Sequence, residues 1–250
     1  MSRNFELLQQ AGKFQEIPPV AREEQSLLVD AAATGTPVLE MTGMARDEIT
    51  KLVKRLFMIP KAGAPRSVVF AATETGNGCS WLCARSAELL ASLVRGSVCL
   101  LDGNLRSSGL HRQFGLEDYS GLSGATGQNE SIRRYAQPLS MPNLWLLGWG
   151  STADSAQAPL AMDRLRTVLR DLRKQFDHII VDAGALDRGT DGIVLSSLAD
   201  GAVLVLKANS SRKDSARKAL QEFQAANVPV LGVVLNRRSF PIPEAIYKRL

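Results

Sequence analysis

The chain has 250 residues, of which 45% are hydrophobic and 22% are charged, with a formal net charge of +5 at pH 7. This composition is typical of a globular protein with one large core, and no apolar run approaches the roughly 18 residues that a membrane-spanning helix needs. The opening residues MSRNFELLQQ do not resemble a signal peptide, so we expect a cytoplasmic protein.

The cysteines and the basic residues exclude two further classes. Three cysteines, Cys79, Cys83 and Cys99, are too few for a disulfide framework. Cys79 and Cys83 would lie one turn apart on a helix, but neither histidine is near them in sequence, which argues against a metal site there. Basic residues are spread over several helices without interleaved aromatic residues, so we expect solvated helix faces and no nucleic-acid partner.

Residues 1–43 are expected to form a short helix and then an irregular arm, because residues 13–43 are interrupted by prolines and glycines. Apolar residues fall at helical spacing between residues 45 and 58, which leaves a polar side that carries Glu48, Lys51 and Lys54. We therefore divide the chain into an N-terminal helix and arm, residues 1–43, and a folded domain, residues 44–250.

Residues 67–94 predict a buried strand, a glycine-bearing turn and a helix, which is the layout of a phosphate-binding loop. The usual loop, G-x-x-x-x-G-K-[ST], places a lysine on the β- and γ-phosphates and a hydroxyl on magnesium. Here Cys79 occupies the lysine position, whereas Ser80 retains the hydroxyl. We therefore expect a nucleotide cradle that lacks its lysine and consists of Gly76, Asn77, Gly78, Cys79 and Ser80.

Further apolar strands are predicted at residues 98–102, 144–147, 178–182, 202–206 and 230–235. They alternate with amphipathic helices, one at residues 160–175 and another that Ser211 and Asp214 would open as a capping box. This alternation predicts an α/β fold with a mostly parallel, doubly wound sheet of the P-loop NTPase type. Ligands bind beyond the carboxyl ends of such strands, so the loop, Asp102 and Asp182 should converge.

Three segments follow one another in a characteristic order: VVFAATETGNGCS, CLLDGNLRSSGLHRQFGL and FDHIIVDA. With them, residues 44–250 resemble the bacterial tyrosine kinases (BY-kinases) of capsule and exopolysaccharide synthesis. The resemblance implies ATP or ADP with Mg²⁺ as cofactors. It also implies a partner, the cytoplasmic segment of a membrane protein that controls polysaccharide chain length and export, which would hold the chain at the inner face of the membrane.

The resemblance also implies roles for particular residues. Gly76, Gly78 and Ser80 match the Walker A loop, Asp102 and Arg106 match the following D-x-D-x-R element, and Asp182 matches Walker B. Asp102, Arg106 and Asp182 would then be catalytic, and Ser80, Asp102 and Asp182 would hold Mg²⁺.

The same resemblance places an oligomerisation helix, E-x-x-R-x-x-R, at Glu48, Lys51 and Lys54. Both arginines of the family pattern are lysines here, which removes their bidentate geometry and should weaken contacts in a homo-oligomer.

The sequence departs from the family pattern around the expected site. Cys79 replaces the lysine, Asn104 replaces the second aspartate of D-x-D, and Ala183-Gly184 replaces a proline-containing turn. The family's tyrosine-rich tail is also missing.

These departures bear on function because phosphoryl transfer depends on positioning and charge stabilisation. They favour a catalytically impaired, BY-kinase-like protein that acts as an interaction partner. One alternative is an active tyrosine autokinase or ATPase in which another subunit, or a residue such as Arg106, supplies the missing cation. A second is a partition-type protein that binds a surface under nucleotide control.

Overall fold

The structure is a computed structural model that describes residues 41, 43–59, 63–104, 109–116, 121–122, 131–148 and 162–238. The predicted N-terminal helix lies outside these residues, as do almost all of the arm and Arg106. Within the described part of the chain, no helix is both long and apolar enough to cross a bilayer.

A seven-stranded sheet forms the centre of the described domain, with the strand order β3-β4-β2-β5-β1-β6-β7. Only the edge pair of β3 and β4 is antiparallel, and the other neighbours are parallel. The predicted α/β fold with a mostly parallel sheet is therefore confirmed, with the strand before the phosphate loop in the interior. The strands are β1 (Ser67–Ala72), β2 (Val98–Asp102), β3 (Gln137–Pro138), β4 (Leu144–Leu147), β5 (His178–Ala185), β6 (Gly201–Lys207) and β7 (Val230–Asn236).

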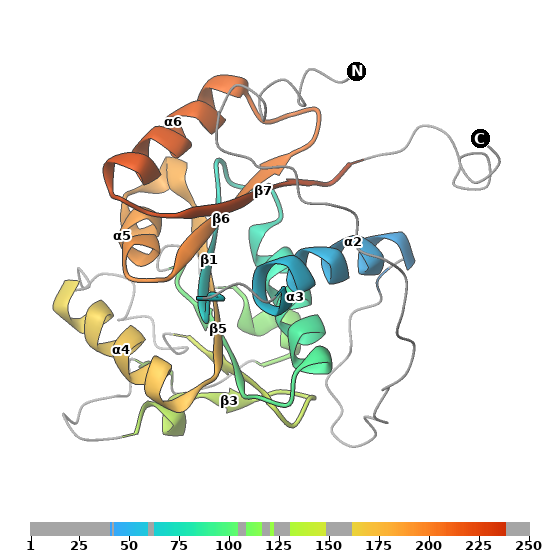
Figure 1. The fold of residues 1–250 in the computed structure, drawn as a ribbon, viewed down its shortest axis with the longest axis vertical. Helices are drawn as coiled ribbons and strands as arrows, with labels where there is room; N and C mark the ends of the chain where they lie inside the picture. Colours follow the sequence, from blue (N-terminus) through green and yellow to red (C-terminus); the bar gives the residue numbers. More distant parts are fainter. Residues whose placement is uncertain are drawn as a thin grey trace. The chain divides into compact units, whose positions relative to one another are not determined.

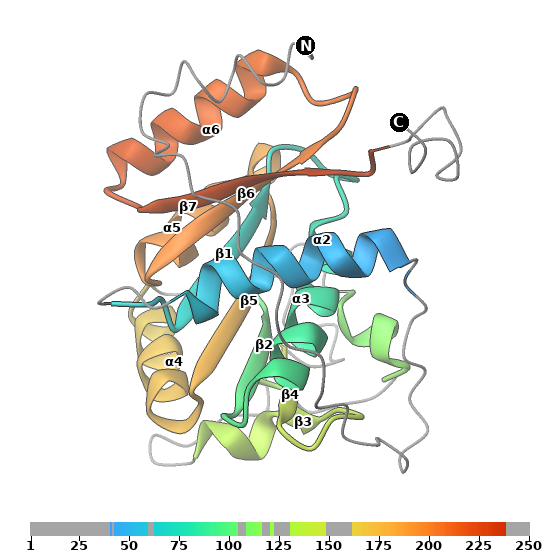
Figure 2. The same ribbon diagram turned by 45° about the vertical axis from the view of Figure 1, so that its right-hand side comes forward.

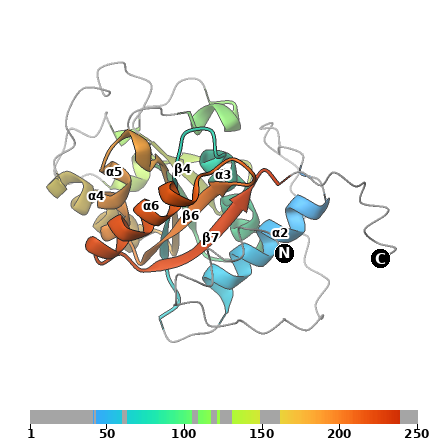
Figure 3. The same ribbon diagram turned by 90° about the horizontal axis from the view of Figure 1, so that it is seen from above.

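Helices cover both faces of this sheet (Figures 1 and 3). Helices α2 and α3 lie on one face and α4, α5 and α6 on the other. Their bounds are α2 (Gly43–Val53), which continues as a π-helical turn over Lys54–Met58, α3 (Cys79–Leu93), α4 (Met162–Gln175), α5 (Asp191–Ser197) and α6 (Lys213–Ala225). Short 3₁₀ helices occur at His111–Phe114, Ile132–Tyr135 and Leu186–Arg188.

The burial of strand β1 explains why its sequence is apolar from Val68 to Ala72. All six of its residues are buried, and successive side chains point to opposite faces of the sheet. Val68 and Phe70 pack in the core layer under α3, whereas Val69 and Ala71 pack in the layer under α4 to α6. A strand covered on both faces needs apolar residues at every position, so β1 shows no alternation.

Helix α2 packs across α3 on the outer side of its layer (Figure 2). Its predicted amphipathic pattern is confirmed, because Ile49 and Val53 are buried. Glu48 and Lys51 form an ion pair of 2.7 Å whose side chains are 67% and 61% exposed. The charged face of α2 is therefore free of contacts with the core.

The predicted capping box before α6 is wrong. Arg212 occupies the cap position, without a side-chain hydrogen bond to the helix. The Ser211 hydroxyl instead accepts a hydrogen bond of 2.9 Å from the N–H of Lys207, at the end of β6. The sequence pattern did not reveal this competing donor, because Lys207 lies before the turn and not in the helix.

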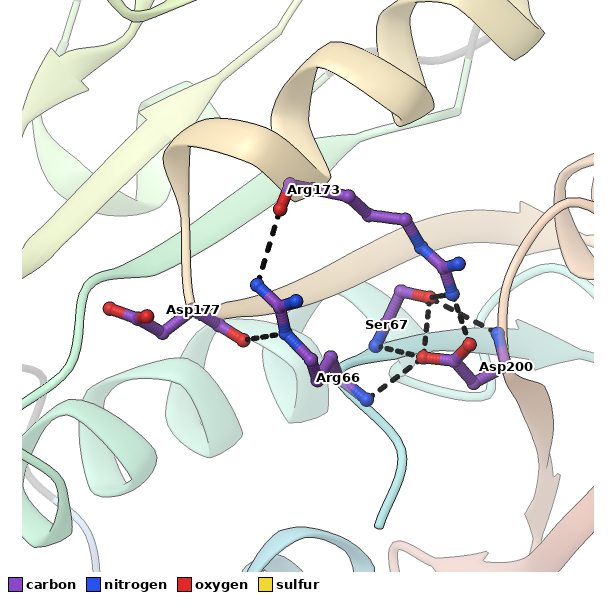
Figure 4. Close-up of polar contacts among 5 residues, drawn as sticks. All are labelled: Arg66, Ser67, Arg173, Asp177 and Asp200. Atoms are coloured by element: carbon purple, nitrogen blue, oxygen red, sulfur yellow. Dashed lines mark hydrogen bonds and ion pairs between the residues drawn. The ribbon is translucent and has the colours of Figure 1, made fainter. Parts of the chain in front are cut away.

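Asp200, just before β6, ties together the ends of several elements at the amino-terminal edge of the sheet (Figure 4). The N–H groups of Arg66 and Ser67 each donate to its Oδ2 at 2.8 Å. Arg173 at the end of α4 pairs with Oδ1 of Asp200 and donates to Ser67 Oγ at 2.7 Å. Arg66 Nε also donates to the Asp177 carbonyl at 3.0 Å, which adds the segment before β5.

We expect Asp200→Asn to lower the free energy of unfolding at pH 7 by about 1–3 kcal/mol, because its hydrogen bonds and ion pair use a carboxylate. The 33% exposure of this side chain favours the lower part of that range. Burial raises the pKa of Asp200, but the N–H groups of Ser67 and Arg66, with Arg173, outweigh it and hold the pKa below its ordinary 3.8. The stabilisation is thus present above pH 3.8 and is lost as the pH falls through the lower, folded-state pKa.

Urea unfolding at pH 7 and at pH 3 measures both effects. The control is Asp214→Asn, since Asp214 is 92% exposed and its ion pair with Arg217 is 3.5 Å long. If Asp200→Asn and Asp214→Asn lower the free energy of unfolding equally, the Asp200 network does not stabilise the fold.

Candidate functional site

The turn between β1 and α3 has the backbone geometry of an anion-binding loop. Gly76 and Gly78 adopt φ values of 85° and 83°, in the left-handed region that favours glycine. Helix α3 begins at Cys79, and its cap residue is Gly78, which has no side chain to occupy the N–H groups of the first turn. The first-turn N–H groups of α3 are therefore suited to bind an anion, as the sequence pattern predicts.

Two asparagines hold this loop against the strands beside it. Asn77 is buried, and its Nδ2 donates to Thr73 Oγ1 at 3.0 Å and to the Val205 carbonyl at 3.3 Å. Asn236, at the end of β7, donates from Nδ2 to the Asn77 carbonyl at 2.9 Å. The side chain of Asn77 therefore positions the loop, so its contribution to a bound ligand would come from the backbone.

The sequence interpretation assigned no function to Asn236 or Arg237, yet both lie at the loop. A Cβ atom added to Gly78 would lie 2.5 Å from Asn236 Nδ2 and 3.4 Å from Arg237 Nε. The missed signal was their position, because the Asn-Arg pair ends β7 at the edge of the sheet where ligands bind.

Asp102 is the last residue of β2, and Asp182, three residues before the end of β5, is its direct partner in the register of the two strands. Both are only 1% exposed. The Asp102 oxygens accept the N–H groups of Asn104 at 3.2 Å and Leu110 at 3.3 Å, so its carboxylate also orders the loop after β2.

Asp182 lies closer to the phosphate-binding loop. Its Oδ1 accepts the Gly184 N–H at 3.1 Å, whereas its buried Oδ2 has no hydrogen-bond partner among the described residues. Burial raises the pKa of Asp182. The nearby Ser80 hydroxyl, the Gly184 N–H and the Cys79 thiol lower it, but by less than burial raises it. The Ser80 and Cys79 groups favour the carboxylate by proximity, but neither meets hydrogen-bond geometry at Oδ2.

Cys79 does not replace the charge of the missing lysine. The Cys83 thiol donates a hydrogen bond that favours a Cys79 thiolate, but burial and the Asp182 carboxylate outweigh it and raise the pKa of Cys79 to about 11. Cys79 is 6% exposed, and its Sγ lies within 4.8 Å of Cys83 Sγ and an Asp182 oxygen. At neutral pH the lysine position is thus a protonated thiol among buried side chains.

The other departures from the family pattern lie beside Asp182 as well. Strand β5 continues through Ala183 and Gly184 to Ala185, so no turn follows Asp182 directly. Gly184 adopts a φ of 68°, and a Cβ added there would lie 2.7 Å from Asn104 Cγ. The Asn104 side chain therefore lies against the end of β5.

The structure thus brings together most of the residues that the sequence singled out. The loop of Gly76 to Ser80, Asp102 and Asp182 lies at one edge of the sheet. Arg106 lies outside the described residues. Glu48 and Lys51 lie on α2, and Lys54 begins the π-helical turn that continues it.

Comparison with known proteins shows which proteins this chain is related to. No protein-family model matches the chain. The tyrosine-protein kinase ptk of Acinetobacter johnsonii is 24% identical over 159 residues, which are 64% of this chain but only 22% of that kinase. The tyrosine-protein kinase YwqD of Bacillus subtilis is 25% identical over 171 residues, or 68% of this chain and 72% of YwqD. The chain is a distant homologue of bacterial tyrosine kinases.

Solved structures share the fold. The chimeric protein CapA2B2 superposes with a TM-score of 0.68 at 21% identity, covering 78% of this chain and 85% of that one. The septum site-determining protein MinD of Pyrococcus horikoshii, solved with Mg-ADP, has a TM-score of 0.60 at 20% identity, covering 74% of this chain and 76% of MinD. The fold of this kinase relative is therefore that of the P-loop NTPases.

The residues around the loop include some, but not all, of the groups that bind a magnesium nucleotide. The glycine turn and the start of α3 suit phosphate oxygens, and the Ser80 hydroxyl lies near the Asp182 carboxylate, a hard donor pair that suits Mg²⁺. The cation that would bind the β- and γ-phosphates is absent from its usual position, because Cys79 stands there.

Proposed function

We propose that this chain is a catalytically impaired BY-kinase-like protein that serves as an interaction partner or regulator in exopolysaccharide or capsule synthesis and export. It would work in the cytoplasm, at the inner face of the membrane, by binding the cytoplasmic segment of a membrane protein of that pathway. The observation that carries the proposal is that a buried cysteine, Cys79, stands at the position of the phosphate-binding lysine.

The chemistry of phosphoryl transfer explains why the residue at this position determines whether the protein can catalyse the reaction. Phosphoryl transfer leaves a protein little to do except position the groups and stabilise charge on the transferring oxygens. A charge-assisted contact contributes about 1.5–3 kcal/mol, and loss of one transition-state donor slows a reaction by about 10²–10³. Asn104 also lacks the carboxylate expected there, so two changes affect the same step.

In this proposal the remaining residues of the site bind nucleotide and Mg²⁺ but do not catalyse phosphoryl transfer. Backbone N–H groups from Gly76 to Ser80 would hold the phosphates weakly, while Ser80 and Asp182 would hold Mg²⁺ and Asp102 would order the adjacent loop. A bound Mg²⁺ would supply charge neutralisation between the phosphates. The preserved fold would then present surfaces to partners.

We expect the purified protein to show no tyrosine autophosphorylation and negligible ATP hydrolysis. Mass spectrometry for phosphotyrosine after incubation with Mg-ATP, together with a phosphate-release assay, tests this. Ser80→Ala is the matched control, because it removes the magnesium hydroxyl and so reveals any turnover that comes from a contaminant. Turnover by the parent that Ser80→Ala abolishes would overturn the proposal.

One observation favours the alternative of an active kinase or ATPase. Arg237 lies at the loop, with its Nε 3.4 Å from a Cβ position on Gly78, so its guanidinium could provide the missing positive charge. If the parent turns over ATP, Arg237→Ala should abolish that activity and Arg237→Lys should retain part of it.

The charged face of α2 is a candidate for self-association or partner docking. Glu48, Lys51 and Lys54 are exposed, while Ile49 and Val53 on the same helix are buried. We expect Glu48→Lys with Lys51→Glu and Lys54→Glu to reduce the mass in solution, or the mass of the complex with the partner's cytoplasmic segment. Sedimentation analysis measures both masses.

The control reverses the exposed Lys218 and Glu222 pair on α6, whose atoms are 3.9 Å apart. If the α2 variant leaves both masses as they are in the parent, α2 is only a solvated helix.

A further inference from the structure

We propose that Cys79, Cys83 and Asp182 form a binding site for a thiophilic divalent metal ion of the zinc class. Each residue offers one ligand atom, and the two sulfurs and the carboxylate oxygen all lie within 4.8 Å of one another. All three residues are buried, with exposed fractions of 6%, 0% and 1%. The site shares Asp182 with the residues proposed above to hold Mg²⁺, but it needs no nucleotide, so it is tested without one.

The backbone explains how these atoms meet. Cys79 and Cys83 are four residues apart on α3, so both thiols lie on the same side of the helix. Asp182 comes from β5, the strand next to β1, and β1 leads through the loop into α3. Helix and strand thus deliver their ligands to one point, although no sequence motif joins them.

The spacing suits a metal ion. In a tetrahedral zinc site, bonds of about 2.3 Å to sulfur and 2.0–2.2 Å to oxygen place neighbouring ligand atoms roughly 3.5–3.8 Å apart. The separations here, at most 4.8 Å, would have to shorten by no more than about 1.0–1.3 Å. A change of this size is comparable with the displacement of a terminal atom by a modest side-chain rotation.

A second observation points to the same ligand. Oδ2 of Asp182 is buried and has no hydrogen-bond partner among the described residues, while Oδ1 is held by the Gly184 N–H at 3.1 Å. A buried polar atom without a partner costs about 1–3 kcal/mol, so a fold that keeps one needs a reason. A metal ion on Oδ2 would supply the missing partner, with the Gly184 N–H orienting the carboxylate.

The donor atoms select the metal. Two sulfurs and one oxygen favour Zn²⁺ and similar ions over Mg²⁺, which prefers oxygen ligands. Three protein ligands leave a fourth position for water or for the Ser80 hydroxyl, which lies near Asp182. Both thiols must lose a proton when they bind a metal ion. Affinity should therefore increase with pH.

The third cysteine provides a matched control. Cys99 is also fully buried, but it lies on β2 in the other core layer, under α4 to α6. Replacing any of the three cysteines by alanine removes the same atom from a buried position. Only the α3 pair should affect metal binding.

The test is a titration of the reduced full-length protein with Co²⁺ followed by displacement with Zn²⁺, without nucleotide. We expect one equivalent of Co²⁺ to give thiolate-to-cobalt charge-transfer absorption that Zn²⁺ abolishes. Cys79→Ala, Cys83→Ala and Asp182→Asn should each weaken binding by more than the 10–100-fold typical of an outer-shell change. Cys99→Ala should leave the affinity within about twofold of the parent, and circular dichroism checks that each variant is folded.

Three results would overturn the proposal: a folded, reduced parent without thiolate-to-cobalt absorption, equal losses for Cys99→Ala and the α3 variants, or a disulfide between Cys79 and Cys83 that forms in preference to metal binding. If an alanine variant does not fold, X-ray absorption of the zinc-loaded parent decides instead. Two sulfur ligands per zinc support the site, and none or one excludes it.

Discussion

The double variant Cys79→Lys with Asn104→Asp is expected to bind Mg-ATP about ten- to a hundredfold more tightly than the parent. One restored charge-assisted phosphate contact, at about 1.5–3 kcal/mol, corresponds to an affinity change of this size. The direction of the Cys79 side chain supports the expectation, since its Sγ lies within 4.8 Å of an Asp182 oxygen. A lysine there could pair with Asp182 before the nucleotide binds and with a phosphate afterwards.

The second substitution acts on the other side of Asp182. The Asn104 side chain lies against Gly184, so an aspartate at this position would add a carboxylate beside the proposed magnesium residues. Tighter binding should precede any turnover, because β5 continues past Asp182 through Ala183 and Gly184, and Arg106 still has to be in position.

Calorimetry with and without Mg²⁺ measures this change. Cys79→Met is the matched control, because methionine has nearly the length of lysine without its charge. The two single variants show whether the effects add, which neighbouring sites often fail to do. A folded double variant that binds no better than the parent would mean that the loop has lost nucleotide binding as a whole, leaving only a scaffold function.

The fold could be predicted from the sequence because its strongest signals are local. The apolar runs that became β1, β2, β5 and β6 are buried on both faces, whereas β7, at the edge of the sheet, is only partly buried. Such runs between amphipathic helices specify a parallel sheet. The meeting of the loop with Asp102 and Asp182 followed from topology, because parallel strands end at the same edge. The two-residue strand β3 and the seven-residue helix α5 were missed, since neither is long enough to show a period.

The part of the site that could not be predicted depends on contacts between distant segments. Cys79 and Cys83 gave no reason to expect a metal until β5 was found beside β1, which brings Asp182 to the thiols. Asn236 could not be assigned to the loop, because 159 residues separate it from its acceptor Asn77. The Ser211 hydroxyl was wrongly predicted to cap α6, since a nearby N–H competes for it.

We expect Gly78→Ala to lower the free energy of unfolding by about 2–5 kcal/mol and to abolish anion binding at the loop. Alanine in the left-handed region costs roughly 1–2 kcal/mol, and Gly78 has a φ of 83°. Its new Cβ would also lie 2.5 Å from Asn236 Nδ2, so Asn236 must move and give up its 2.9 Å hydrogen bond to the Asn77 carbonyl. Loss of this partly buried hydrogen bond adds about 1–3 kcal/mol.

Two other glycines separate backbone strain from the contact with Asn236. Gly76 and Gly63 have φ values of 85° and 88°, and a Cβ added to either would meet nothing within 4 Å. Alanine at these positions should therefore cost only the roughly 1–2 kcal/mol of the left-handed backbone. Urea unfolding of the three variants, each also combined with Asn236→Ala, gives the coupling energies. Asn236→Ala should relieve part of the Gly78→Ala loss and none of the Gly63→Ala loss. Equal losses for Gly78→Ala and Gly63→Ala would show that Asn236 does not hold the loop, and the site would then depend on β1 and α3 alone.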